Sequence, residues 1–118
     1  MMTKPFGPEE SEALDAALLD LAKTGKTASY AELAEQMRLE APHRIHRLTL
    51  ALEARIALDH EAGRPLLAAM AVGKFGTPGR GFFQFLRALG RYDGPDSGPE
   101  AASHHAKERA AAEAYWRG

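Results

Sequence analysis

Cysteine is absent from this sequence of 118 residues. Its absence excludes disulfide bonds, thiolate catalysis and cysteine-ligated zinc or iron–sulfur centres. It also fits a reducing compartment. No apolar run approaches the ~20 residues that a membrane-spanning helix needs, and residues 1–8 lack the apolar stretch of a secretion signal. These absences together predict a cytoplasmic protein.

An excess of charge of either sign is lacking as well, since the formal net charge is only −1. The distribution is less even than the total: residues 38–91 carry 9 basic and 4 acidic side chains, whereas both flanking segments are acidic. A basic middle segment is typical of an anion-binding surface. The alternative is that the acidic ends fold back and neutralise it within the domain.

The composition is that of an ordinary globular protein, with 45% apolar and 26% charged residues. A chain of this length fits one domain, which can bury a core without disulfides or metal. We therefore expect a single domain over residues 1–118.

The first half of the chain predicts three helices. The first begins near Pro8, carries acidic residues in its first turn and ends at Gly25. Ser29 to Glu32 has the form of a capping box, which predicts a second, short helix with Tyr30, Leu33, Ala34 and Met37 buried. A turn over residues 38–41 leads to the third and longest helix, from Pro42 to Gly63, with a buried face formed by Ile45, Leu48, Leu52 and Ile56.

The second half predicts less regular structure. Residues 66–72 are apolar and are interpreted as a buried strand, with a helix as the alternative. Four glycines and a proline predict a loop over residues 73–81, followed by an aromatic-rich helix from Phe82 to Leu89. After another loop, an alanine-rich helix from Pro99 to Trp116 is expected on the surface, anchored by Tyr115 and Trp116. The fold class is therefore mostly α, α+β with minimal strand.

This order of elements is that of a winged helix-turn-helix core over residues 8–72, with residues 73–118 adding two C-terminal helices. The helix from Pro42 then corresponds to the recognition helix. Long hydrogen-bond donors at its N-terminal end suit base edges and phosphates of double-stranded DNA, and the loop that follows residue 72 stands where a wing would lie. The predicted nucleic-acid-binding residues are His43, Arg44, His46, Arg47, Lys74 and Arg80.

A local resemblance accompanies this interpretation. Residues 27–34, Thr-Ala-Ser-Tyr-Ala-Glu-Leu-Ala, resemble the start of the winged-helix domain of alkylguanine alkyltransferases and alkyltransferase-like proteins. Those enzymes use a Pro-Cys-His-Arg motif that this chain lacks, so the resemblance implies a helix-turn-helix and excludes alkyl transfer. From Ser29 onward the chain also resembles a family of small uncharacterised bacterial proteins, through residues 43–47, 63–67, 78–83 and 89–92, which implies no function.

Two other functions remain open from the residues alone. A regulatory DNA-binding protein is the leading hypothesis, and a protein-interaction module or homodimer is the second, with Phe82, Phe83 and Trp116 as partner-binding residues unless they belong to the core. The third is a small enzyme that uses His43, His46 or His104. Neither catalytic residues nor a cofactor is predicted, because no complete catalytic motif is present, and the His43–His46 spacing lacks a third metal ligand. Carboxylates such as Glu53 and Asp59 are interpreted as solvated.

Overall fold

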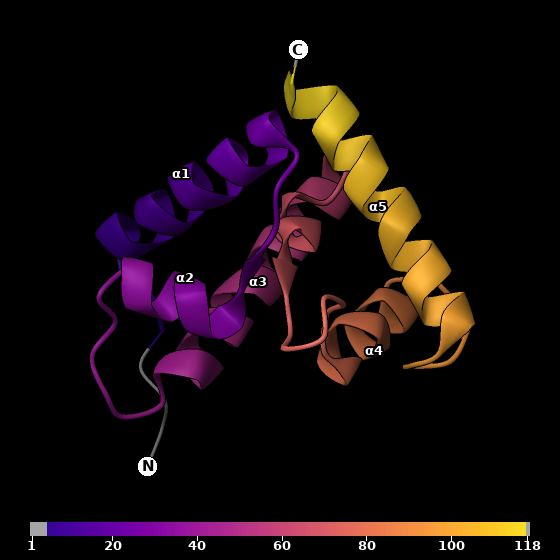
Figure 1. Ribbon diagram of the computed structural model, residues 1–118. Coiled ribbons are helices and arrows are strands. Elements are labelled where there is room, and N and C mark those ends of the chain that lie inside the picture. Colours follow the sequence, from indigo (N-terminus) through magenta and orange to yellow (C-terminus); the bar gives the residue numbers. More distant parts are fainter. Residues whose placement is uncertain (1–4, 118) are drawn as a thin grey trace.

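The computed structural model describes residues 5–117, which form five α-helices, one short 3₁₀ helix and two short strands (Figure 1). In chain order the elements are α1 (Pro8–Thr24), β1 (Ala28–Ser29), α2 (Tyr30–Gln36), α3 (Arg44–Glu61), η1 (Leu67–Met70), β2 (Ala71–Val72), α4 (Arg80–Ala88) and α5 (Pro99–Arg117). The expectation of a mostly helical fold with minimal strand is confirmed.

The predicted boundaries of α1 and the start of α2 are confirmed. Helix α1 begins at Pro8, and Gly25 ends it with a left-handed φ of 68°. At the start of α2, the Ser29 hydroxyl accepts a hydrogen bond from the Glu32 backbone N–H at 3.0 Å. The Glu32 carboxylate in turn accepts one from the Ser29 N–H at 2.9 Å. The capping box therefore fixes where β1 stops and α2 starts.

The third helix begins later than predicted. Pro42 was expected to be its first residue, but α3 starts at Arg44. His43, the residue before it, has a left-handed φ of 63°, which is incompatible with a right-handed helical turn. The connection between α2 and α3 consequently runs over residues 37–43 and is longer than the predicted turn.

The strand predicted over residues 66–72 is wrong for most of its length. Residues 67–70 form η1, and only Ala71 and Val72 are extended. These two residues pair in parallel with β1, in the register Ala28 to Ala71 and Ser29 to Val72. Within residues 5–117 no second wing strand follows, because the chain passes from β2 through residues 73–79 directly into α4.

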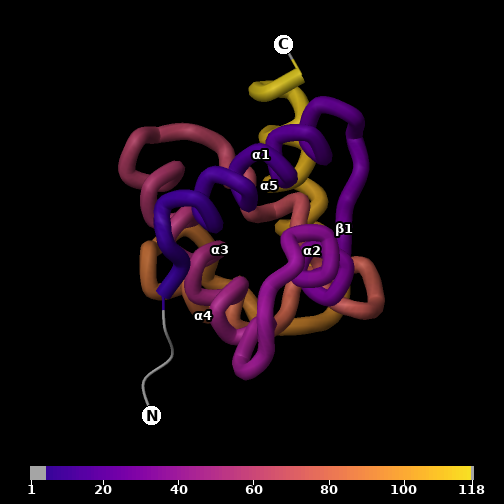
Figure 2. Tube along the Cα trace, turned by 90° about the vertical axis from the view of Figure 1, so that its left-hand side faces the viewer, coloured from indigo at the N-terminus to yellow at the C-terminus, as the bar shows by residue number. Residues whose placement is uncertain are grey.

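The core lies where α1, α3, η1, α4 and α5 converge. Its fully buried members include Leu18, Leu48, Met70 and Phe83. Helix α5 packs against α1 and η1, and the C-terminal ends of α1 and α5 meet at one end of the molecule (Figure 1). Of the two predicted anchors of α5, Trp116 packs partly against the core, whereas Tyr115 is 55% exposed. The connection between α2 and α3 lies at the opposite end (Figures 1 and 2).

Over the described part of the chain, none of the helices is both long enough and apolar enough to cross a bilayer.

Candidate nucleic-acid interface

The N-terminal end of α3 presents three of the predicted contact residues to solvent. His43, Arg44 and His46 are all exposed. Within residues 5–117, their side chains take part in no hydrogen bond or ion pair, and no side chain caps this helix end. The first backbone N–H groups of a helix have no partner inside the helix, and they carry the positive end of its dipole. This end of α3 therefore combines available donors with one permanent positive charge.

Arg47 is placed differently from its neighbours. Its side chain is only 12% exposed, and its Nη2 donates to both carboxylate oxygens of Glu10, at 2.8 and 3.0 Å. Its guanidinium carbon lies 5.3 Å from the centre of the Phe6 ring. Arg47, predicted as a nucleic-acid-binding residue, therefore connects α3 to the start of α1 instead of standing free in solvent.

Ile45 shows the opposite error, since it was expected in the buried face of α3 and is 39% exposed. It lines a groove of about 590 Å³ together with the N-terminal residues of α2 and with Gly73 and Lys74. The fold thus brings Lys74, from the loop after β2, to the same groove as the first turn of α3.

The groove also holds a negative charge. Glu32 lines it, and hydrogen bonds from the Ser29 backbone and side chain lower the pKa of its carboxyl group. Its charge therefore opposes the approach of a phosphate backbone to Lys74.

Arg80 belongs to a neighbouring cleft. This cleft, of about 270 Å³, lies between residues 73–80 and the loop before α5, and Lys74, Arg80 and Asp96 line it. Asp96 forms an ion pair with Arg87 and accepts a hydrogen bond from Gln84. Gly73 and Lys74 line both hollows, so these two residues connect the cleft of Arg80 with the groove at the start of α3.

The glycine-rich loop is held by its own backbone. The Gly73 N–H donates to the Thr77 carbonyl at 2.8 Å, and Gly76 has a positive φ of 86°. The Gly79 N–H donates to the Tyr30 hydroxyl at 3.1 Å, and burial raises the pKa of this phenol. These contacts are those of a tight connector between β2 and α4.

Two of the predicted partner-binding residues lie inside the protein. Phe82 and Phe83 are 8% and 1% exposed, and their rings pack edge to face with centroids 5.1 Å apart. Their assignment to the core is confirmed, and the assignment to a partner surface is wrong. Trp116 packs partly against the core, while Phe75, which the sequence analysis did not single out, is 89% exposed.

A buried polar network was also missed, because Asp59 was interpreted as solvated. Asp59 is fully buried and accepts hydrogen bonds from Arg55, Arg64 and the Leu67 backbone N–H. Nearby, Arg91 donates a hydrogen bond to Glu108 at 2.7 Å, and both side chains are largely shielded from solvent. The Arg55–Asp59 pair has the i,i+4 spacing of one helix and could have been found in the sequence, whereas the contacts with Leu67 and between Arg91 and Glu108 join separate elements.

The histidines do not gather into one site. His104 contacts Glu108, His60 contacts Arg91, and His105 is buried against the Ala69 carbonyl, whereas His43 and His46 stand at the start of α3. Among the residues that the structure describes, no group of three or more histidines and carboxylates is arranged to hold a metal ion.

Arg38 is a further candidate that sequence reasoning overlooked. It lies in the connection between α2 and α3, is exposed, and has a left-handed φ of 55°. Of the arginines in residues 5–117, only Arg38, Arg44 and Arg80 take part in no ion pair. Two of these three flank the same connection, so the uncompensated arginine charge is concentrated at this end of the molecule.

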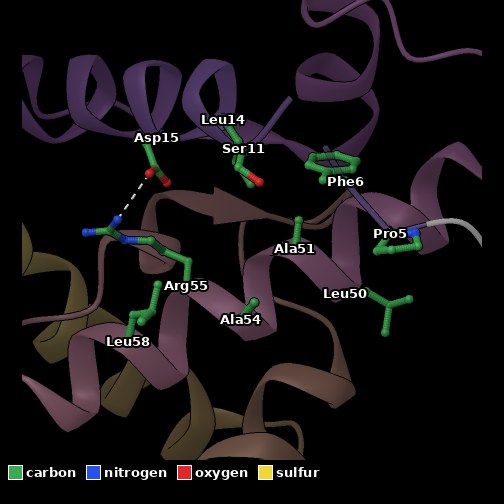
Figure 3. A pocket seen from close by; sticks show the side chains of 10 residues that line it. All are labelled: Pro5, Phe6, Ser11, Leu14, Asp15, Leu50, Ala51, Ala54, Arg55 and Leu58. Atoms are coloured by element: carbon green, nitrogen blue, oxygen red, sulfur yellow. Dashed lines mark hydrogen bonds and ion pairs between the residues drawn. The ribbon is translucent and has the colours of Figure 1, made fainter. Parts of the chain in front are cut away.

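A separate apolar groove of about 200 Å³ lies between α1 and α3 (Figure 3). Phe6 and Leu14 form the side nearer α1, and Leu50, Ala51, Ala54 and Leu58 come from α3. At one end Arg55 reaches the carboxylate of Asp15 at 3.2 Å.

In comparisons with known proteins, no family model, curated protein or solved structure matches the chain.

Proposed function

We propose that this protein is a regulatory DNA-binding protein that contacts double-stranded DNA with the N-terminal end of α3. The observation that carries the proposal is the state of Arg44: it is exposed, it forms no ion pair with any residue from 5 to 117, and within that range no side chain caps the start of its long helix. Helix N-termini bind phosphate through their free N–H groups, and arginine binds either phosphate or guanine edges. His43 and His46 supply further donors.

The surrounding surface supports binding to the DNA phosphate backbone more than recognition of the bases. Arg38, in the connection before α3, and Lys74, in the groove that Ile45 also lines, add positive charge, whereas Arg47 is engaged with Glu10. Few cationic side chains therefore contribute to DNA binding, and the negative charge of Glu32 opposes them. We infer modest affinity that depends on salt, and a cytoplasmic location in keeping with the lack of cysteine.

The test is fluorescence polarisation of a labelled random-sequence duplex with the intact protein over a series of salt concentrations. Each phosphate contact contributes about 0.9 to the slope of log affinity against log salt. We expect Arg44→Gln to weaken binding and to reduce this slope by about 1. If affinity and slope match those of the unchanged protein, α3 is not the contact helix.

A matched control removes one positive charge at the other end of the molecule. Lys23 lies in the last turn of α1, is exposed and has no ion pair within the described residues. Lys23→Gln should leave the salt slope unchanged. Glu32→Gln should strengthen binding, since it removes the opposing charge and keeps a side chain that a capping box accepts.

A further inference from the structure

Three residues form an exposed apolar row along α3. Leu50 and Leu58 are 40% and 56% exposed, and Ala54, midway between them, is exposed as well. Single exposed leucines are ordinary on protein surfaces. This row is distinguished by its spacing, because residues four apart lie on one helix face, and by its position on the edge of the apolar groove between α1 and α3 (Figure 3).

We propose that this row binds the same row of a second copy of the chain, with the two α3 helices antiparallel and crossing at Ala54. The row reads the same in both directions about Ala54, as a two-fold axis requires of a self-complementary surface. Leu50 of one copy would then contact Leu58 of the other. The small side chain of Ala54 allows the helix axes to approach to roughly 9–10 Å, within the usual range for packed helices. This inference goes beyond DNA binding and does not depend on it.

The charges of α3 select the antiparallel arrangement. Arg44 and His46 lie towards its N-terminal end, and the exposed Glu61 is its last residue. His46 and Glu61 are nearly equidistant from Ala54. Antiparallel packing therefore places Glu61 of each copy beside the basic end of the other, and it also opposes the two helix dipoles. Parallel packing would bring like charges together.

The groove provides the remaining apolar contact. The side of the groove nearer α1 is formed by Phe6 and Leu14, and Ala51 of α3 also lines it. A leucine from the second copy that projects past Ala54 meets this apolar wall. Its burial in both copies supplies the hydrophobic contribution to self-association.

Cysteine crosslinking tests both the contact and its direction, because the chain has no cysteine of its own. A disulfide needs Cα atoms about 4.4–6.8 Å apart, which two residues on the crossing axis satisfy. We expect Ala54→Cys to form a dimer on mild oxidation at least about tenfold faster than Ala110→Cys, an exposed alanine of α5. Equal rates for the two variants would overturn the proposal.

Mixing experiments distinguish the two directions. Leu50→Cys and Leu58→Cys should crosslink with each other when mixed and only slowly when alone. Rapid disulfides within each single variant, and not between them, would show parallel packing and contradict the two-fold arrangement.

Sedimentation equilibrium of the unmodified protein measures self-association directly. We expect a concentration-dependent dimer whose dissociation constant rises about tenfold or more in Leu58→Gln. Phe75→Gln, which removes an even more exposed ring on the 73–79 loop, should leave it unchanged. A monomer at every concentration refutes docking of a second copy, whatever the outcome of the DNA titration.

Discussion

At the scale of single residues, Asp59 organises the region between the end of α3 and η1. Its carboxylate accepts hydrogen bonds from Arg55 Nη2 at 3.0 Å, from Arg64 Nε at 3.0 Å and from the Leu67 backbone N–H at 3.1 Å. A buried carboxylate with this many donors is satisfied. Among the described residues, removing its charge leaves Arg64 without an ion-pair partner and leaves Arg55 with only the partly exposed Asp15.

We expect Asp59→Asn to lower the free energy of unfolding by about 3 kcal/mol, since one partner of a buried ion pair is removed. Asp15→Asn is the matched control, because Asp15 also pairs with Arg55 but its side chain is 46% exposed. Its loss should cost less than about 1 kcal/mol. Urea denaturation of both variants measures the difference, and equal losses would show that burial does not set the strength of these pairs.

His105 predicts how stability depends on pH. Burial lowers the pKa of its imidazole below the usual 6.5, although a hydrogen bond to the Ala69 carbonyl partly opposes this. Glu108, Arg109 and His104 also act on it. The folded protein therefore favours the neutral ring, and the unfolded chain takes up the proton first. The stability due to His105 is complete above about pH 6.5 and is lost as the pH falls towards the folded-state pKa.

The measurement is the free energy of unfolding of the unchanged protein and of His105→Gln at about pH 7.5 and about pH 5. Glutamine retains a donor for the Ala69 carbonyl but does not titrate in this range. The unchanged protein should lose more stability on acidification than the variant. Parallel losses would assign the pH dependence to the other histidines.

At the scale of the elements, the helix ends that depend on neighbouring residues were predicted correctly, whereas side-chain contacts between elements were not. The ends of α1 and the capping box of α2 depend on neighbours in the sequence, such as Gly25 and the Ser29–Glu32 pair. Arg47 was misjudged because its partner, Glu10, comes from another element. Asp59 has a local partner in Arg55, but its burial depends on η1, whose Leu67 backbone N–H donates a hydrogen bond to it. The exposed end of α3 followed from the helix pattern, whereas its first residue depended on the left-handed φ of His43.

The capping box gives a prediction at this scale. Helix α2 has 7 residues, so each hydrogen bond at its end is a large share of its total. Ser29→Ala should lower the free energy of unfolding by about 1 kcal/mol. Ser103→Ala, on the exposed face of α5, should change it by less than about 0.5 kcal/mol. Thermal denaturation compares the two, and an unchanged midpoint for Ser29→Ala would mean that tertiary contacts alone hold α2.

At the scale of the whole molecule, the fold is closed by contact between its first and last helices. Helix α5 buries Ala101 and Ala112 against the core, and Arg109 donates to the Gly25 carbonyl at 3.1 Å. Alanine at these positions permits the close approach of α5 to α1 and η1. Composition alone made α5 look like a surface helix with a weak apolar face, because this contact depends on small side chains.

We expect Ala112→Leu to destabilise the protein by about 2 kcal/mol, since the added atoms have no space. Ala111 precedes it on the exposed face, so Ala111→Leu should change stability by less than about 0.5 kcal/mol. Chemical denaturation of both variants gives the comparison. Similar stabilities would contradict the close packing of α5.

The parallel pair of β1 and β2 has a consequence for the order of folding. Two residues on each side are too few to hold together unaided, and the chain between Ala28 and Ala71 must first be closed into a loop at an entropic cost. Helices α2 and α3 lie within that loop, and helices form in about a microsecond or less. The pairing can persist only once α3 has returned the chain to β1, so the amide protons of this ladder should gain protection from exchange with solvent later than those of α3.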